Sequence, residues 1–146
     1  MRNAGYEVFL PTYVTLRQWS DRKKKVEFPL IPGVVFVKNN LDNISELFAF
    51  QYVLKILREK DNYAIVRQIE IDNLEIIAKE WNNESIIRGE KKNLIKGDMV
   101  KIERGNFKGL IGQLKSFNGN HRVIVELEAF NLTFSISISN SSIERI

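Results

Sequence analysis

The residues with the clearest chemical potential are five cations gathered within nine positions. This basic segment, residues 17–25, contains one acid, Asp21, against Arg17, Arg22, Lys23, Lys24 and Lys25. Its net charge of +4 equals the formal net charge of the whole chain, so the remaining residues are neutral on balance. Such a cluster is suited to a polyanion, and Trp19 within it could stack on an unpaired base. Two alternatives stay open: a solvated loop kept soluble by its lysines, and a tryptophan packed against a sheet.

The sequence gives no comparable support for a catalytic, metal-binding or membrane-spanning role. The 146 residues include no cysteine and a single histidine, His121, which argues against disulfides and zinc sites. The acids Asp98 and Glu103 are scattered, and neither a phosphate-binding Gly-Lys-Ser/Thr loop nor a plausible Ser/Cys–His pair occurs. No run of about 18 apolar residues could span a bilayer, and the start of the chain shows no secretory signal. We therefore expect a cytoplasmic protein that is not an enzyme and needs no cofactor or metal.

The spacing of apolar residues predicts both strands and helices in the N-terminal half. The expected strands are 6–10, 26–28, 33–37 and 52–57, and the expected helices cover 43–50 and a segment from about Asp72 to Trp81. About fifteen residues connect the first two strands, whereas hairpin loops usually have two to five. We therefore expect the basic segment to lie on a long surface loop, a kind of element that often carries function.

The C-terminal third is dominated by β patterns and regularly spaced glycines. Gly97, Gly105, Gly109 and Gly112 interrupt alternating apolar and polar residues, which is typical of sharp turns and of strands whose backbone lies very close to a neighbour. After a polar linker at 82–94 we expect five strands, at 99–103, 110–117, 122–128, 132–138 and 142–146. Five short strands in about fifty residues favour a small closed barrel with its function on the outer loops. The expected core residues are Val100, Ile102, Phe107, Ile111, Leu114, Val123, Val125, Leu127, Phe134 and Ile136.

Two groups of residues resemble the NusG family of transcription factors. Gly97-Asp98-x-Val100, followed by Gly105-x-Phe107-x-Gly109-x-x-Gly112, looks like a KOW motif, which belongs to the SH3-like barrel at the C-terminus of that family. Glu7-Val8-Phe9-Leu10-Pro11 and Leu30-Ile31-Pro32-Gly33-Val34 are similar to the second strand and the start of the third strand of its N-terminal domain. Trp19-Ser20-Asp21-Arg22-Lys23-Lys24 resembles specialised paralogs of NusG that govern surface-polysaccharide operons in Bacteroidetes.

The resemblance implies a fold and a domain organisation. It implies an α+β NusG-type N-terminal domain at 1–81, an antiparallel sheet with helices, then the linker at 82–94 and an all-β SH3-like KOW barrel at 95–146. The family normally begins with a Trp-Tyr strand and a helix rich in Lys and Glu, so this N-terminal domain is incomplete at its start. We expect either a late start or a partner chain that fills the gap. The protein would be a monomer, or a dimer formed by edge-strand pairing if the missing strand is truly absent.

The resemblance also implies a function, which is that of a transcription elongation or antitermination factor. RNA polymerase would bind to Ile31, Pro32, Gly33 and Val34, unless these residues belong to the domain core. DNA at the transcription bubble would be contacted by Arg17, Trp19, Arg22, Lys23, Lys24 and Lys25. A ribosomal protein or a termination factor would meet Arg104, Asn106 and Phe107 on the barrel. The alternatives are a ribosome- or RNA-associated KOW protein without polymerase binding, and a plain protein-interaction module.

Overall fold

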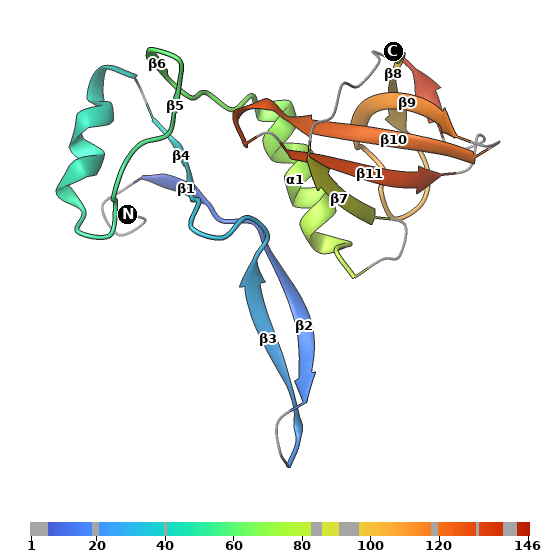
Figure 1. Ribbon diagram of the computed structural model, residues 1–146, viewed down its shortest axis with the longest axis horizontal. Coiled ribbons are helices and arrows are strands. Elements are labelled where there is room, and N and C mark those ends of the chain that lie inside the picture. The colour runs from blue at the N-terminus through green and yellow to red at the C-terminus, as the bar shows by residue number, and fades with distance from the viewer. Residues whose placement is uncertain are drawn as a thin grey trace.

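The computed structural model of the chain describes residues 6–18, 21–39, 41–82, 86–90, 97–117, 120–130, 132–138 and 143–146. Three parts are visible in Figure 1: N-terminal elements around a short two-stranded ribbon, a long hairpin that stands away from the body, and a curled sheet with an α-helix packed beside it. Mixed strands and helices are therefore present, as the α+β expectation for the N-terminal part requires.

The N-terminal ribbon is the antiparallel pair of β1 (Glu7–Phe9) and β4 (Phe36–Lys38). A 3-10 helix, η2 (Leu41–Ala49), follows where a helix at 43–50 is expected, and a small hairpin is formed by β5 (Arg58–Glu59) and β6 (Asn62–Tyr63). The expected strand at 52–57 is wrong, because these residues form a turn and irregular backbone. Tyr52 and Leu54 are exposed, so their side chains lack the sheet surface on which strand-forming residues pack.

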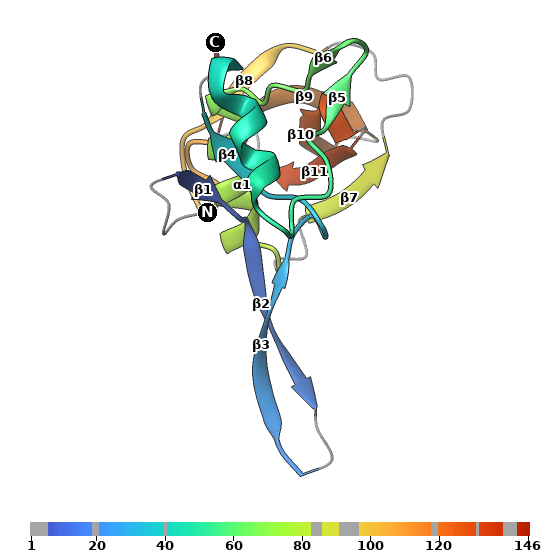
Figure 2. The same cartoon turned by 90° about the vertical axis from the view of Figure 1, so that its left-hand side faces the viewer.

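The long hairpin consists of β2 (Thr12–Gln18) and β3 (Lys23–Pro29), paired from Thr12 opposite Pro29 to Gln18 opposite Lys23. The turned view in Figure 2 shows both strands extending alone beyond the body. The prediction of a fifteen-residue loop is wrong, because paired strands take up most of that connection. Alternating β-branched and aromatic residues, among them Tyr13, Val14 and Thr15, give β2 its strand character.

The α-helix α1 (Gln68–Lys79) begins four residues before the expected start at Asp72. The earlier start is explained by Glu70 in the first turn, whose carboxylate accepts a hydrogen bond of 2.8 Å from the backbone N–H of Arg67, the residue that precedes the helix. The apolar face predicted for this helix comprises Leu74, Ile77, Ala78 and Trp81; the first three are buried. Trp81 is half-buried and lies beyond the end of the helix at Lys79. These side chains pack against the C-terminal sheet.

The C-terminal sheet has six antiparallel strands in the order β12-β8-β9-β10-β11-β7. Their bounds are Ile143–Arg145 for β12, Met99–Ile102 for β8, Ile111–Phe117 for β9, Asn120–Leu127 for β10, Leu132–Ile138 for β11 and Ile86–Glu90 for β7; a 3-10 turn, η3 (Glu128–Phe130), joins β10 to β11. All five expected strands are present. The sixth, β7, lies within the segment 82–94 for which we predict a linker, and it pairs with β11. Residues 83–85 and 91–94 of that segment lie outside the described residues.

The glycine pattern has the two physical causes that the sequence indicates. Gly105 and Gly109 adopt φ of +88° and +94° in the turn after β8, a region that L side chains rarely enter. A Cβ on Gly97 would collide with the backbone carbonyl oxygen of Leu114, and one on Gly112 would lie 2.5 Å from that of Ile124. The first two glycines therefore serve turns, and the other two allow close approach of strands.

One hydrophobic core connects the N-terminal elements to the C-terminal sheet. Leu30 and Ile31, from the turn after β3, lie in the same buried cluster as the helix residues and the sheet residues. The predicted sheet core is confirmed except at Ile111 and Leu114, which are half-buried. Aromatic rings also join the two parts. The ring centroid of Trp81 lies 5.7 Å from that of Tyr13 and 5.9 Å from that of Phe134, and the centroids of Phe36 and Phe130 are 5.9 Å apart.

Candidate nucleic-acid and protein interfaces

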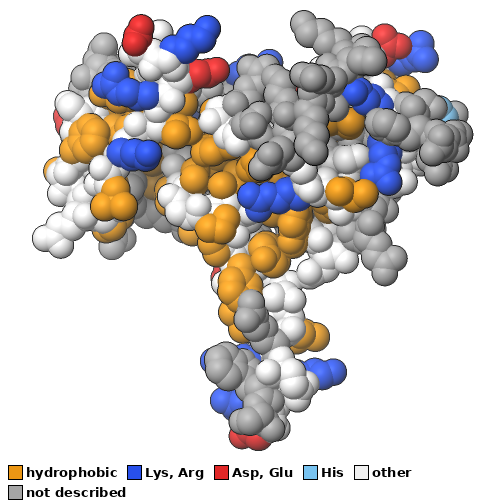
Figure 3. All heavy atoms as spheres, viewed as in Figure 1, with side chains coloured by type: hydrophobic (Ala, Val, Ile, Leu, Met, Phe, Trp, Pro, Cys, Tyr) orange, Lys and Arg blue, Asp and Glu red, His pale blue; other side chains and the backbone are white. Residues whose placement is uncertain are grey.

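The far half of the β2–β3 hairpin presents an exposed cationic surface. Arg22, Lys23, Lys24 and Lys25 are all exposed, and Figure 3 shows Lys and Arg side chains on both sides of the hairpin's outer end. Because successive strand residues point to opposite faces, Lys23 and Lys25 lie on one face and Lys24 lies on the other. Arg17 is the register partner of Lys24, whereas Trp19 lies outside the described residues. The structure thus brings four of the six predicted nucleic-acid residues together as exposed side chains.

These four cations are not neutralised within the part of the chain that the structure describes. The ion pairs there are Lys38 with Glu7, Arg67 with Glu70, Lys79 with Glu75 and Arg145 with Asp98, so no described acid lies within 4.0 Å of the hairpin cations. Asp21 is exposed at the end of the hairpin. A surface with uncompensated positive charge and full solvent access is suited to phosphate groups.

The inner half of the hairpin is fixed to the body by aromatic and polar contacts. The ring centroid of Tyr13 lies 5.9 Å from that of Phe28 across the two strands and 5.7 Å from that of Trp81, which follows the end of helix α1. The side-chain amide of Asn82 donates a 2.7 Å hydrogen bond to the backbone carbonyl of Val14. The side chains of Thr12 and Glu27 also form a hydrogen bond. The base of the hairpin is therefore held at a defined place while its outer end stays free.

The turn 30–34 contains the four residues 31–34 that we predict to bind RNA polymerase, and these are divided between the core and the surface. Ile31 is only 6% exposed, whereas Pro32 and Gly33 are exposed and Val34 is half-buried. Gly33 has a φ of +78° and open space where a Cβ would stand. Leu30 is held on both sides: its N–H donates to the carbonyl of Pro11 at 2.8 Å, and its carbonyl accepts from Arg88 at 3.2 Å. A partner that docks on this surface meets Pro32 and Gly33 first.

The predicted partner loop of the C-terminal sheet is divided in a similar way. Arg104 and Asn106 are exposed, but the ring of Phe107 is 6% exposed and belongs to the core. The loop is tightly closed, because the N–H of Gly109 donates to the carbonyl of Ile102 at 2.8 Å and that of Leu110 donates to Phe107 at 3.1 Å. Arg104 and Asn106 are thus displayed on a rigid turn that Phe107 anchors.

A further exposed apolar surface was not anticipated from the sequence. Phe48 is 50% exposed, Tyr52 64% and Leu54 91%. Tyr52 stacks at 5.8 Å on Phe50, whose ring meets Tyr6 edge-on at 5.8 Å. The signal that could have found this surface is that six of the seven residues 48–54 are aromatic or aliphatic but show no continuous helical or strand period. Exposed groups of this kind mark protein contacts more often than single exposed residues do.

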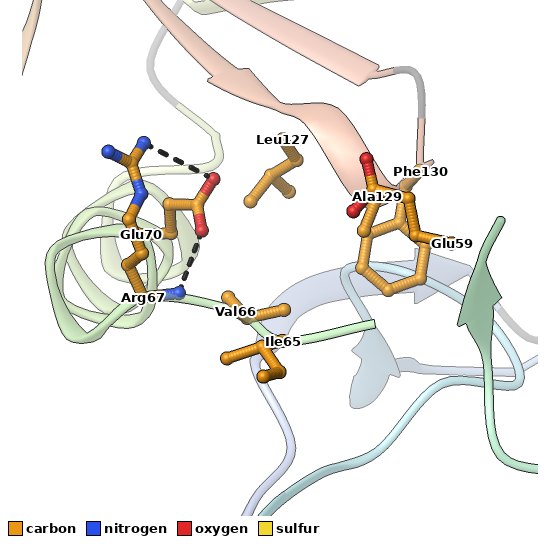
Figure 4. A pocket seen from close by; sticks show the side chains of 8 residues that line it. All are labelled: Glu59, Ile65, Val66, Arg67, Glu70, Leu127, Ala129 and Phe130. Atoms are coloured by element: carbon orange, nitrogen blue, oxygen red, sulfur yellow. Dashed lines mark hydrogen bonds and ion pairs between the residues drawn. The ribbon is translucent and has the colours of Figure 1, made fainter. Parts of the chain in front are cut away.

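A small pocket lies between the start of helix α1 and the end of β10. Its volume is about 160 Å³, and it is lined by Glu59, Ile65, Val66, Arg67, Glu70, Leu127, Ala129 and Phe130 (Figure 4). Figure 4 shows both oxygens of Glu70 engaged by Arg67, one through its backbone N–H and the other through its guanidinium group at 3.7 Å. Pockets that hold small organic ligands usually measure about 300–1,000 Å³. This carboxylate therefore serves the helix start, and the pocket does not suit a cofactor.

Metal and membrane sites were sought among the described residues. In that part of the chain no three His, Cys, Asp or Glu side chains lie close enough together to hold a metal ion. Of the helices described, none has the length and apolar character needed to cross a bilayer.

Comparison with known proteins gives one family. A family model described as transcription termination factor nusG matches residues 1–75, just over half of the chain. This range includes the ribbon, the hairpin, the turn 30–34 and most of helix α1. No curated protein matches the chain.

Proposed function

The chain belongs to the NusG family of transcription factors, and from this premise we propose that it is an elongation or antitermination factor that acts on RNA polymerase. The observation that carries the proposal is the basic hairpin, which lies inside the matched range and projects from the body with four exposed cations. A transcription factor that travels with polymerase needs one surface for the enzyme and another for nucleic acid. The hairpin and the apolar surfaces beside it are separate in the fold and can serve these two purposes.

RNA polymerase would bind to the N-terminal part of the chain. The turn 30–34 offers Pro32 and Gly33 as its exposed members and Val34 as a half-buried one, with Ile31 supporting the turn from the core. The exposed residues Phe48, Tyr52 and Leu54 extend the apolar area available to a protein partner. A helical partner needs a few apolar anchors of this kind on an open surface.

DNA at the transcription bubble would be held by the hairpin. Arg22, Lys23, Lys24 and Lys25 supply the charge, and Arg17 and Trp19 remain members of the proposed set by their sequence position. Phosphate contacts of this kind are independent of sequence and weaken as salt rises.

The C-terminal sheet would be a KOW-type, SH3-like barrel that meets a second partner, a ribosomal protein or a termination factor. Support comes from the five strands in the expected order and from the turn that displays Arg104 and Asn106 over Phe107. The rigid closure of this turn by the glycines at 105 and 109 favours a preformed recognition surface.

The direct test is capture of RNA polymerase by the tagged chain from a purified mixture. The informative variant is Pro32→Glu, which places a charge on the exposed part of the turn and should abolish capture. Met99→Glu is the matched control, because Met99 is also an exposed apolar residue (43%) but lies in the C-terminal sheet. If the folded wild-type chain captures no polymerase, the proposal fails. Co-sedimentation with ribosomes in that case would favour the alternative of a ribosome-associated protein.

A further inference from the structure

We propose that the ligand of the β2–β3 hairpin is B-form duplex DNA and that the hairpin enters its major groove. This inference rests on the proposed function and states which form of DNA the hairpin contacts. The juxtaposition that points to it is three consecutive exposed lysines, Lys23, Lys24 and Lys25, on both faces of a free two-stranded ribbon. Three features of the ribbon favour this ligand: its width, the length of its cationic part and the distribution of charge between its faces.

The width of the hairpin suits one groove. Two paired strands lie about 4.8 Å apart, and a two-stranded ribbon with its side chains is admitted by the major groove, which is about 12 Å wide. The minor groove of undistorted B-form DNA is about 6 Å wide and would have to be widened, at a cost in free energy, to admit the ribbon. Each strand has seven residues, so the ribbon extends about 23 Å from its base at about 3.3 Å per residue. Because the ribbon stands clear of the body (Figures 1 and 2), its outer end can enter a groove without collision of the body with the duplex.

The length of the cationic part matches the depth of that groove. Lys23, Lys24 and Lys25 occupy the first three positions of β3 and span about 7 Å from the first Cα to the last, while the major groove is about 8.5 Å deep. The next exposed position inward is Glu27, which is acidic and forms a hydrogen bond with Thr12. The sign of the charge therefore changes where the ribbon would leave the groove, and repulsion between Glu27 and phosphate would limit deeper entry.

The two-faced distribution of charge favours a duplex over a single strand. Inside a major groove a ribbon has a phosphate backbone on either side, and Lys24 faces one side while Lys23 and Lys25 face the other. A single strand has one backbone and binds best to a charged face with aromatic rings on which bases stack. The rings of Tyr13 and Phe28 lie at the inner end of the hairpin, where Tyr13 contacts Trp81, so they offer no stacking surface beside the lysines. Trp19 belongs to the basic segment by sequence and lies outside the described residues, and the single-strand measurement below tests its stacking on a base. An RNA duplex does not fit either, because its major groove is deep and narrow.

The first experiment measures binding of the full chain to four labelled nucleic acids by fluorescence anisotropy. They are a short DNA duplex, one of its strands alone, the RNA duplex of the same sequence, and the DNA duplex with a bulky group on C5 of every cytosine. Since C5 substituents project into the major groove, we expect the plain duplex to bind at least tenfold more tightly than the other three. Equal or tighter binding of the single strand overturns the proposal, and so does unchanged binding of the C5-substituted duplex.

The second experiment tests whether both faces act together. With four phosphate contacts, a fourfold rise in salt should weaken duplex binding by about 150-fold; with three contacts, by about 40-fold. Lys24→Gln and Lys25→Gln, one on each face, should each produce the smaller value, whereas Lys55→Gln, an exposed lysine outside the hairpin, should keep the larger one. If only one of the two variants, Lys24→Gln or Lys25→Gln, reduces the salt dependence, the proposed contact on both faces is overturned. These assays contain no polymerase, so their failure would leave a positive polymerase capture standing.

Discussion

Asn73→Ala should destabilise the protein more than any other single loss of a polar side chain on helix α1. Asn73 is 4% exposed, and its side chain makes two hydrogen bonds to the backbone of Ile111 in β9. The amide nitrogen donates to the Ile111 carbonyl at 2.8 Å, and the Ile111 N–H donates to the amide oxygen at 3.0 Å. Truncation to alanine leaves a backbone donor and a backbone acceptor without these partners. At about 1–3 kcal/mol for each unsatisfied group, the expected loss in the free energy of unfolding is about 2–6 kcal/mol.

Urea unfolding followed by far-ultraviolet circular dichroism measures this loss. A decrease of about 3 kcal/mol with a slope near 2 kcal/mol per molar urea lowers the midpoint by about 1.5 M. The control is Asp72→Ala, its neighbour on the helix, which accepts a 2.9 Å hydrogen bond from Gln68 on the exposed surface. That variant should lose less than about 0.5 kcal/mol. If Asn73→Ala shifts the midpoint no more than Asp72→Ala does, this pair of hydrogen bonds does not hold the helix to the sheet.

Three further predictions concern the sheet and its aromatic contacts. Gly112→Ala should lower the free energy of unfolding in urea by about 1–3 kcal/mol, because the new Cβ would lie 2.5 Å from the Ile124 carbonyl oxygen. A smaller decrease would mean that β9 and β10 can move apart without cost. Trp81→Ala should cost about 2–4 kcal/mol through the loss of its contacts with Tyr13 and Phe134, and an unchanged unfolding midpoint would contradict a shared core. Glu144→Gln should raise the melting temperature at neutral pH and have no such effect in acid. The hydrogen bond to the Glu103 carboxyl raises the pKa of Glu144, so the stability that this contact provides is present below the unfolded-state pKa and is lost as pH rises through the folded-state pKa. If Glu144→Gln raised the melting temperature equally at neutral and at acid pH, the contact between Glu144 and Glu103 would not be the cause.

Features encoded by neighbouring residues were predictable from the sequence. The five C-terminal strands follow from alternation, and Gly105 and Gly109 follow from turns that require positive φ. The apolar face of α1 follows from helical spacing, although its start did not, because the capping pair of Arg67 and Glu70 precedes the apolar run. In each case the residues that decide the structure are close to one another in the sequence.

Features decided by distant partners were not predictable in this way. Strand β3 begins with three lysines, which have low strand propensity, and its pairing depends on β2 across a turn. Strand β7 has only Ile86 and Ile87 as apolar residues and gains its place by pairing with β11 more than forty residues later. The bond between Asn73 and Ile111 spans 38 positions and leaves no local signal. The candidate site shows the same division: that the lysines are exposed could be expected, but their separation onto two faces requires this segment to be a strand, which its pairing with β2 decides.

The burial of Ile31 decides which residues of the turn 30–34 can test the polymerase contact. Bringing Leu30 and Ile31 to the surface would expose two core side chains, at about 1.5–3 kcal/mol each, and would also break the 3.2 Å bond from Arg88. A polymerase contact made by Ile31 must offset that cost, whereas one made by Pro32 and Gly33 need not. Ile31→Ala should destabilise the fold by about 2–5 kcal/mol, so loss of polymerase capture by that variant would not separate binding from folding. Pro32→Glu changes an exposed turn residue at a cost of about 1 kcal/mol or less. Loss of capture with an unchanged urea midpoint in Pro32→Glu would therefore locate the contact on the exposed part of the turn, and full capture would exclude it from there.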